Sequence, residues 1–307
     1  MNEARHVVAV LGRGVVDADE PVVTADDLGL TRGDGCFDSA RVVTDASGHA
    51  TVVDLDDHLD RLHASAVALS VAGPSRQEWQ GLVAQALTAW SVPGEAVLKL
   101  LLTRGREWGS DGATALVTIT HRGASPEPPE PPEPPEPPGP PGAPGPHPGP
   151  RTITAVTLSR GHPSDAFTDA PWLLGGVKTL SYVVNAAATR EARRRGADDV
   201  IFISTDGFAL DGPTSGLLVA RDGALVSTPT GATGILESLT VAAVLEAARA
   251  EGYATRYELV PVEALYTADA VWLVSSGRGP ALVTLLDGRE LRTDADLAAR
   301  VARYAGF

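Results

Sequence analysis

The chain has little cysteine, few basic residues and no long apolar run. One of its 307 residues is cysteine, Cys36, which excludes an internal disulfide framework and a cysteine-based zinc site. It carries 25 basic against 39 acidic residues, and this net charge of −14 argues against a nucleic-acid partner. No apolar run approaches the ~20 residues of a membrane span, and the N-terminus has no signal-peptide core. We therefore expect a soluble, cytoplasmic protein that binds no metal, nucleic acid or membrane.

Lysine is the rarest basic residue. The sequence contains two lysines, Lys99 and Lys178, and the other 23 of its 25 basic residues are arginines. Arginine replaces lysine wherever only charge is needed, but a guanidinium cannot perform amine chemistry. Each lysine is therefore a candidate for such chemistry, although Lys99 lies in a strand-like segment where it can simply be a charged surface residue.

Proline, in contrast, is concentrated in residues 126–150, where it occupies 15 of 25 positions. Such a segment cannot form a helix or an interior strand, so we expect extended polyproline II structure. Its Glu-Pro-Pro repeats could bind a proline-recognising partner, but a solvated linker is the simpler interpretation. We therefore predict one domain over residues 1–125, a linker over 126–150 and a second domain over 151–307.

Hydrophobic periodicity predicts an α+β pattern on both sides of this tract. We expect helices over residues 56–71, 74–90, 238–253 and 294–307, and another from Thr179 to a stop at Gly196. A serine, Ser238, is the expected N-cap of the third of these. We expect a glycine-containing turn over residues 28–43. The other apolar runs predict strands within 6–16, 51–55, 96–105, 114–123, 152–161, 199–205, 208–220, 224–229, 256–262, 270–276 and 281–288.

Four features indicate chemistry on their own. Lys178 follows two glycines just before a predicted helix, and Asp211 is the acidic residue of an otherwise uncharged strand-turn segment. Residues 238–240 open a helix whose free N–H groups suit a phosphate, and Arg61 can direct a guanidinium at an anion. An amine, a carboxylate and two phosphate-binding elements are what pyridoxal phosphate requires. Each feature also has a structural alternative, as a surface lysine, a turn residue, a helix cap or a surface charge.

The order and spacing of these residues resemble the class IV, or fold type IV, pyridoxal-phosphate enzymes. Residues 177–215 are similar to the signature region of that family, residues 30–42 to its glycine turn and residues 56–66 to its phosphate-arginine helix. The resemblance implies a two-domain α+β fold, with a small N-terminal α/β domain and a larger, barrel-like C-terminal α/β domain. It also implies a pyridoxal 5′-phosphate cofactor and a homodimer.

The resemblance assigns roles to individual residues. Lys178 matches the catalytic lysine that is bonded to the cofactor, and Arg61 and the Leu239–Thr240 pair match the phosphate site. Tyr182 matches the neighbour of the phenolic oxygen, and Asp211 matches the acid that pairs with the pyridine nitrogen. The implied cofactor-binding residues are Lys178, Arg61, Tyr182, Asp211, Ser238, Leu239, Thr240, Ser275 and Ser276. The substrate-binding candidates are Phe37, Arg104 and Arg106, of which the two arginines would bind a carboxylate.

The chain departs from the family pattern at several positions. Asp211 and Asp38 stand where glutamate is usual, and Ser238 replaces a glycine before the phosphate pair. The Pro-rich tract stands where relatives have an ordinary interdomain connection. Because the lysine is retained, we expect cofactor binding to persist, with efficiency altered by the shorter acids.

Within the family, residues 178–182 and 211–215 are most similar to the actinobacterial lyase-like branch. We therefore predict a 4-amino-4-deoxychorismate lyase, which eliminates pyruvate to give 4-aminobenzoate, a folate precursor. The alternative is a class IV aminotransferase acting on D-amino acids or branched-chain amino acids. A further alternative, from another functional class, is a catalytically weak paralogue or a scaffold that recruits a partner through the Pro-rich tract.

Overall fold

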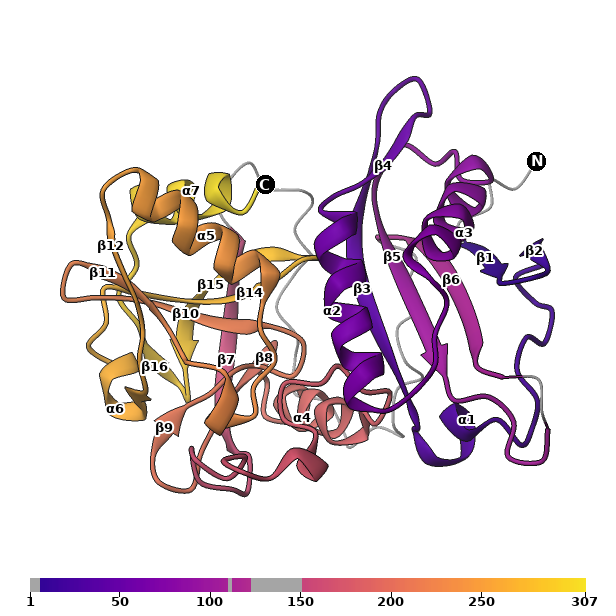
Figure 1. Cartoon of the computed structure of the whole chain (residues 1–307). Helices are drawn as coiled ribbons and strands as arrows, with labels where there is room; N and C mark the ends of the chain where they lie inside the picture. Colours follow the sequence, from indigo (N-terminus) through magenta and orange to yellow (C-terminus); the bar gives the residue numbers. More distant parts are fainter. Residues whose placement is uncertain (1–5, 110–111, 123–150) are drawn as a thin grey trace, which may run out of the picture.

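Two β-sheets flanked by helices make up the computed structural model (Figure 1), which describes residues 6–109, 112–122 and 151–307. One sheet is built before the Pro-rich tract and the other after it. The tract itself, with its predicted polyproline II structure, linker role and partner binding, lies outside the described residues. Within the described part of the chain, no helix is long and apolar enough to cross a membrane.

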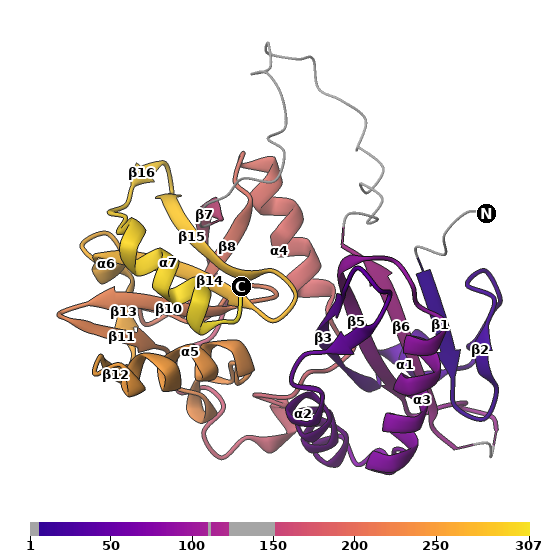
Figure 2. The same cartoon turned by 90° about the horizontal axis from the view of Figure 1, so that it is seen from above.

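The N-terminal sheet has six antiparallel strands in the order β2-β1-β6-β5-β3-β4. These are β1 (His6–Val10), β2 (Gly14–Val16), β3 (Gly35–Thr44), β4 (Ala50–Val52), β5 (Gly94–Thr103) and β6 (Thr114–His121), with the short helix α1 (Leu28–Arg32) before β3. Helices α2 (Leu55–Ala68) and α3 (Arg76–Thr88) cover one face of the sheet, where they bury a common apolar core. The end of the sheet that carries β3 and β4 lies next to the second half of the chain (Figures 1 and 2).

Local residues stabilise the N-termini of both helices. Acidic residues occupy the first turn of α2, where they complement the helix dipole. A capping box starts α3, because the Ser75 hydroxyl accepts from the Glu78 N–H and the Glu78 carboxylate accepts from the Ser75 N–H. The buried side chains of both helices recur on one side, which fixes how they lie on the sheet.

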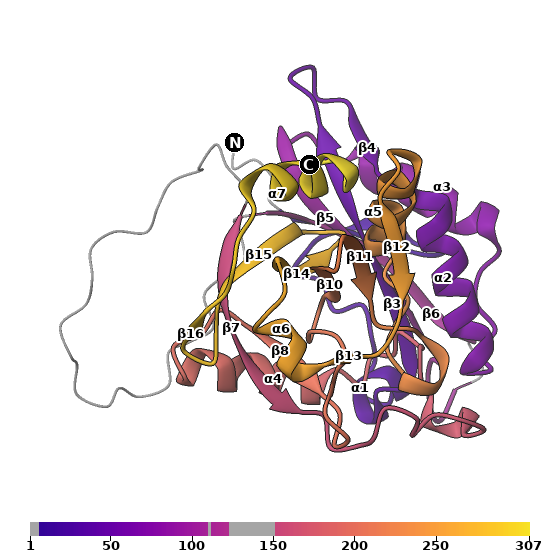
Figure 3. The same ribbon diagram turned by 90° about the vertical axis from the view of Figure 1, so that its left-hand side faces the viewer.

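The C-terminal sheet is mixed and strongly curved (Figure 3). Its main path is β12-β11-β10-β14-β15-β7-β8-β9-β13, with β16 paired to β15. The strands are β7 (Thr152–Ser159), β8 (Asp199–Ile203), β9 (Phe208–Ala209), β10 (Gly216–Arg221), β11 (Ala224–Ser227), β12 (Ala254–Tyr257), β13 (Val260–Pro261), β14 (Ala270–Ser275), β15 (Gly279–Leu286) and β16 (Arg289–Glu290). The edge strands β12 and β13 are consecutive in the chain, and strands from both ends of the path share one core that includes Val226 and Val260. The sheet is therefore barrel-like, as expected.

Three long helices lie outside this sheet. They are α4 (Val183–Arg194), α5 (Leu239–Ala250) and α7 (Ala295–Tyr304); the short α6 (Val262–Leu265) contributes Leu265 to the enclosed core. The helices α5 and α7 share a core with the sheet through Val244 and Val301, whereas α4 covers β7 and β8. Ser238 is the N-cap of α5, as predicted, because its side chain accepts from the Val241 N–H.

Two local predictions were wrong. Residues 28–43, expected as a turn, form α1 and most of β3. The helix expected from Thr179 begins at Val183 instead. Segment 178–180 is held extended against β3, where the Phe37 N–H donates to the Lys178 carbonyl at 3.0 Å and the Leu180 N–H donates to the Gly35 carbonyl at 2.9 Å. Pairing with a distant strand thus replaces the first turn that the local sequence favours.

Candidate active site

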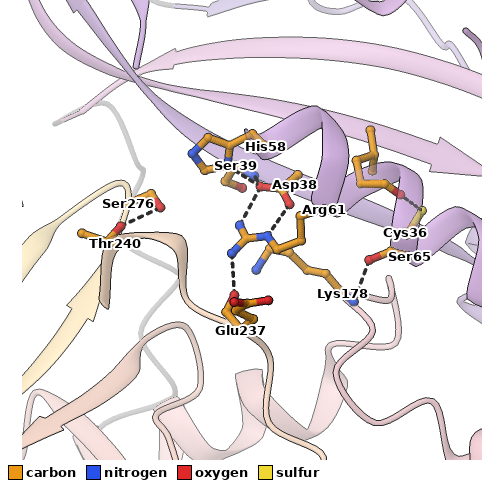
Figure 4. Close-up of polar contacts among 11 residues, drawn as sticks. Cys36, Asp38, Ser39, His58, Arg61, Ser65, Lys178, Glu237, Thr240 and Ser276 are labelled. Carbon is orange, nitrogen blue, oxygen red and sulfur yellow. Dashed lines mark hydrogen bonds and ion pairs between the residues drawn. The ribbon is translucent and has the colours of Figure 1, made fainter. Parts of the chain in front are cut away.

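Most of the predicted site residues meet in a cleft between the two sheets. Figure 4 shows Arg61 of α2 between the Asp38 carboxylate of β3 and the backbone of Glu237, which precedes α5. The Lys178 side chain runs toward this guanidinium group. A pocket of about 360 Å³ opens beside Arg61 and is also lined by Gly176 and by Leu239 of α5.

Lys178 is held by its backbone and surrounded by aromatic rings. Its N–H donates to the Ser65 hydroxyl at 3.3 Å, while its amine lies 4.6 Å from the Phe37 ring centroid and 6.0 Å from that of Tyr182. Burial, assisted by the positive charge of Arg61, lowers the pKa of the amine from 10.5 to about 8. A substantial fraction of the amine is therefore neutral near pH 8, as a nucleophile or base must be.

Arg61 is fixed by a buried acid. Its Nε and Nη2 donate to the two oxygens of Asp38 at 2.7 and 2.8 Å, and Asp38 is fully buried. His58 supports the same carboxylate through its Nδ1, at 2.7 Å. Burial alone would raise the pKa of Asp38, but the hydrogen bonds from Arg61 and His58 lower it to about 2. The carboxylate is thus ionised at neutral pH and sets the orientation of the guanidinium group.

This arrangement leaves Arg61 able to bind an anion. Of its five N–H groups, two donate to Asp38 and one, on Nη1, donates to the Glu237 carbonyl at 2.9 Å. One N–H on each terminal nitrogen therefore remains for a ligand. Because the Glu237 carbonyl is two residues from the start of α5, the bond also brings Arg61 to the N-terminus of that helix.

The N-terminus of α5 supplies further donors. The N–H groups of Leu239 and Thr240 donate to no acceptor in the described ranges, as is usual for the first turn of a helix. The Thr240 hydroxyl lies 2.9 Å from that of Ser276, which follows β14. Backbone amides, paired hydroxyls and the helix dipole therefore converge near Arg61, an arrangement that binds phosphate groups.

Asp211 and Tyr182 lie on the C-terminal side of the cleft. The Asp211 carboxylate has no hydrogen bond or ion pair with another of the residues that the structure describes, and burial raises its pKa from 3.8 to about 7. The positive charges of Arg160 and Lys178 oppose that rise. The Tyr182 hydroxyl donates to the Pro213 carbonyl at 2.6 Å, which places it beside the turn that begins with Asp211.

A phenylalanine joins the lysine segment to the segment that precedes α5. A Cβ on Gly175 would lie 2.5 Å from the Phe167 ring, and one on Gly234 would lie 2.3 Å from it. The Gly176 N–H also donates to the Gly234 carbonyl at 3.0 Å. Both contacting glycines must therefore lack a side chain for the two segments to pack around this ring.

Four other predicted site residues have evident structural contacts. The Ser238 hydroxyl caps α5, and Ser275, the last residue of β14, pairs with Gly279 across the turn that carries Ser276. Arg104 binds Asp34 at 2.6 Å and the Leu69 carbonyl at 2.8 Å, so it ties the loop before β3 to the end of α2. The Nε of Arg106 lies 3.1 Å from the Asp26 carboxylate. The suggested substrate-binding roles of these arginines remain predictions.

Several residues that support the candidate active site were not predicted from the sequence. Sequence reasoning gave no supporting role to His58, although its spacing of three residues from Arg61 places both on one face of α2. It also missed Arg160, whose charge acts on Asp211, and nothing distinguishes this residue from the other arginines in the sequence. Lys99 is exposed on β5, consistent with a surface role. Among the described residues, no group of His, Cys, Asp and Glu side chains is arranged to hold a metal.

Comparison with known proteins agrees with this geometry. The family model described as "Amino-transferase class IV" matches residues 35–286. A curated protein of Mycobacterium tuberculosis, a "bifunctional aminodeoxychorismate lyase / D-amino acid transaminase", is 37% identical over 93% of each chain. The chain belongs to the class IV aminotransferase family.

Solved structures extend the similarity to the fold. A fold IV transaminase from Curtobacterium pusillum, CpuTA1, has 36% identity and a TM-score of 0.83, with 98% of this chain and 97% of that chain covered. A "hypothetical aminotransferase" of M. tuberculosis, solved with PLP and with α-ketoglutarate and PMP, has 35% identity and a TM-score of 0.80, with coverage of 97% and 98%. This class IV enzyme therefore has the fold type IV architecture and uses pyridoxal phosphate as its cofactor.

The side chains of the cleft fit that cofactor. Its phosphate requires cationic and N–H donors, which Arg61 and the first turn of α5 provide. Its aldehyde requires an amine, and Lys178 has one with a lowered pKa. Its ring nitrogen requires an acid, and Asp211 is a carboxyl group without a partner in the described ranges.

Proposed function

We propose that this enzyme is a 4-amino-4-deoxychorismate lyase, which converts aminodeoxychorismate into 4-aminobenzoate and pyruvate. The observation that carries this proposal is the 37% identity, over 93% of both chains, to a protein whose name includes that activity. The Lys178 amine and the donors around Arg61 support it, because the elimination needs a base beside a phosphate-anchored cofactor.

We assign the cofactor phosphate to Arg61, to the N–H groups of Leu239 and Thr240, and to the Thr240 and Ser276 hydroxyls. Asp211 would hold the proton of the ring nitrogen. Tyr182 would donate its hydroxyl proton to the phenolic oxygen in place of the Pro213 carbonyl, to which it donates in this structure. Ser238 would support the phosphate site by capping α5. Of the proposed cofactor-binding residues, Ser275 has the least structural support, because its side chain makes no hydrogen bond within the described residues.

Lys178 would carry the proton transfers. Its neutral amine takes a proton from the substrate carbon that bears nitrogen, and bound pyridoxal phosphate supplies the electron sink for this step. The bond between the substrate ring and the enolpyruvyl oxygen then breaks, and the ring becomes aromatic. Lys178 returns a proton to the methylene carbon of the departing enol, which gives pyruvate. Phe37 and Tyr182 restrict water around the amine, because their rings lie beside it.

Transamination of D-amino acids is the second candidate. It is favoured by the second half of the same relative's name, "D-amino acid transaminase", and by the α-ketoglutarate in one structure of a mycobacterial relative. Both reactions begin with proton removal by the lysine. They then differ in whether a leaving group departs or a proton returns elsewhere, and we propose that both use this cleft.

The decisive experiment is a paired assay of the holoenzyme. One sample receives aminodeoxychorismate, and 4-aminobenzoate and pyruvate are measured together; the other receives D-alanine and α-ketoglutarate. Equal amounts of both products in the first sample support the lyase, whereas turnover confined to the second sample would replace it with a transaminase. Turnover in neither, despite a near-visible absorption band from bound cofactor, would indicate a catalytically weak paralogue; absence of the band would favour the scaffold.

We also propose that residues 1–125 and 151–307 are two domains of a homodimer, joined by the tract at 126–150. The two separate sheets support the division into domains, since they have different cores. The dimer is expected from family membership. Light scattering on an active preparation should give twice the chain mass of 31.8 kDa, and a monomeric mass would refute it.

A further inference from the structure

The turn between β14 and β15 carries Ser276 into the phosphate site, and it is held from two directions. On one side, Arg278 of the same turn extends its guanidinium group to the start of β8, where its Nη2 lies 2.8 Å from the carboxylate of Asp199. On the other side, the Arg278 carbonyl accepts from Nη2 of Arg122 at 3.1 Å. The turn is therefore connected to both sheets.

The same guanidinium group reaches the turn that carries Asp211. Its Nη2 also donates to the Ser215 hydroxyl at 3.3 Å, and the Gly212 N–H donates to the Ser215 carbonyl at 2.8 Å. Segment 211–215 is thus a closed turn with Asp211 at one end and the Arg278 contact at the other. One side chain therefore joins the phosphate side of the cleft to the side proposed for the ring nitrogen.

The connection to the N-terminal sheet is electrostatic. Arg122, at the end of β6, forms an ion pair with Glu95 of β5, and Glu95 also binds Arg41 of β3 at 3.1 Å. Strand β3 also supplies Asp38, the acid that fixes Arg61. A continuous series of contacts therefore runs from the strand that orients Arg61 to the turn that carries Ser276.

The position of the Arg278 side chain reduces the stability of the protein. Its Nε is buried without a hydrogen-bond partner in the described part of the chain. Its ion-pair partner, Asp199, is also almost fully buried. An unpaired buried N–H reduces stability, so this position is less favourable than that of a fully paired arginine. The unpaired Nε shows that the guanidinium group is held by its Nη2 contacts rather than by optimal pairing of all its donors.

We propose that Arg278 is a positioning residue that sets the separation between the phosphate-binding turn at Ser276 and the ring-side turn at Asp211. It is not among the residues that we assign to the cofactor or the substrate. Through Asp199 and Ser215 it fixes the ring-side turn relative to its own hairpin, and through Arg122 the hairpin is fixed to the sheet that supports Arg61. The inference rests on the proposed cofactor roles of Ser276 and Asp211.

The test compares Arg278→Ala, Arg278→Lys and Ser215→Ala with Arg292→Ala. The control removes an arginine that lies 3.9 Å from Asp269 on the surface of the same half of the chain. For each variant, the dissociation constant of pyridoxal phosphate is measured by absorbance, the melting temperature is measured without cofactor, and kcat and KM are measured at saturating cofactor.

We expect Arg278→Ala to raise the cofactor dissociation constant about 10- to 100-fold, by analogy with the loss found when groups that orient metal ligands are removed. Its kcat should fall while KM stays within about threefold, because no substrate contact is lost. Arg278→Lys should recover part of the affinity through Asp199. Ser215→Ala should keep the affinity but lower kcat, since only the contact to the Asp211 turn is lost. Arg292→Ala should match the wild type.

Wild-type cofactor affinity and kcat in Arg278→Ala would overturn the inference, even with a lower melting temperature. If that variant does not fold, Ser215→Ala provides the test, and an unchanged kcat in Ser215→Ala would also overturn the inference. Asp211→Asn and Ser276→Ala, measured alongside, separate this inference from the site assignment. Weaker binding or turnover in those two variants but not in Arg278→Ala overturns the inference alone, whereas no effect in any of them overturns the site assignment as well.

Discussion

The two halves of the chain contribute polar groups to the cleft that differ in whether they have protein partners. On the N-terminal side, Asp38 is fully buried and paired with both Arg61 and His58. On the C-terminal side, Asp211 has no partner among the described residues, and the first N–H groups of α5 have no acceptor there. A paired network gives a rigid support, whereas buried groups without partners mark the place where a ligand completes them.

The largest effect is expected at Lys178. Lys178→Ala removes the amine, and turnover should fall at least about 10³-fold, since both the nucleophile and the base are lost. Borohydride reduction of the wild type followed by peptide mapping should label Lys178. The matched control is Lys99→Ala, which removes the other lysine and should leave turnover within a few-fold. Labelling at Lys99, or at neither residue, would falsify the assignment.

The next effect is expected on the paired side. Asp38→Asn leaves Arg61 and His58 without the charge that holds them, and breaking a buried ion pair of this kind costs about 3–5 kcal/mol. The pKa of Asp38 is lowered from 3.8 to about 2 by its hydrogen bonds, so its stabilising contribution is complete above pH 4 and is lost as the pH falls through 2.

Urea unfolding of cofactor-free protein at several pH values measures this contribution. The wild type should lose stability between about pH 4 and pH 2 more steeply than Asp38→Asn, which has no carboxyl group to protonate there. Asp222→Asn is the control, because that acid pairs with Arg221 at the surface. Equal stability of the Asp38 variant and the control at pH 7 would show that the network gives no rigid support.

At Asp211, removal of the charge is expected to raise the stability of the cofactor-free protein, whereas at Asp38 it lowers it. Burial raises the pKa of Asp211 from 3.8 to about 7, so this group lowers the stability of the cofactor-free protein as the pH rises from 4 to 7, and the loss is constant above that. Asp211→Asn should therefore stabilise cofactor-free protein at pH 8, by an amount on the order of 1–3 kcal/mol. The same variant should lose most of its turnover, because an amide cannot keep a ring nitrogen protonated.

Thermal melting without cofactor and turnover with it separate these two consequences. Asp211→Glu restores the length usual in the family and should retain more turnover than Asp211→Asn. If Asp211 only closes its turn, a common role for aspartate beside glycine and proline, Asp211→Asn will keep near-normal turnover. That result would remove Asp211 from the site without affecting Lys178.

The smallest effect is expected from the segment between the two sheets. Replacement of residues 126–150 by a short Gly-Ser connection should change turnover by less than about threefold, because none of the assigned site residues lies there and the free energy of loop closure varies slowly with length. Steady-state kinetics with a melting curve provides the measurement. A large loss of turnover at an unchanged melting temperature would mean that the tract takes part in the site.

The fold class followed from periodicity and family resemblance, but local boundaries did not. The helix at 183–194 could be predicted from its own residues, whereas its start could not, since segment 178–180 pairs with β3 through Phe37 and Gly35. Likewise, 23 similar arginines give no sign of which ones form internal contacts. Arg104 binds Asp34, 70 positions away in the chain, and such pairings depend on the sheet register.

The site was more predictable where chemistry limits the choice of residue. Lys178 stood out because an amine cannot be replaced by a guanidinium group, and the structure places it beside Arg61. The support for Arg61 was not predictable, because Asp38 and His58 come together only once α2 lies on β3. Residues that react are thus easier to recognise in the sequence than residues that hold them.

Strand β3 serves two layers of the molecule at once. Asp38 faces α2, while the side chain of its neighbour Phe37 points to the opposite face of the strand and lies beside the Lys178 amine. Because adjacent residues of a strand point to opposite faces, inserting or deleting one residue here would exchange the two faces and remove both contacts together. A change of side chain at constant length, such as aspartate for glutamate at position 38, keeps both faces in place.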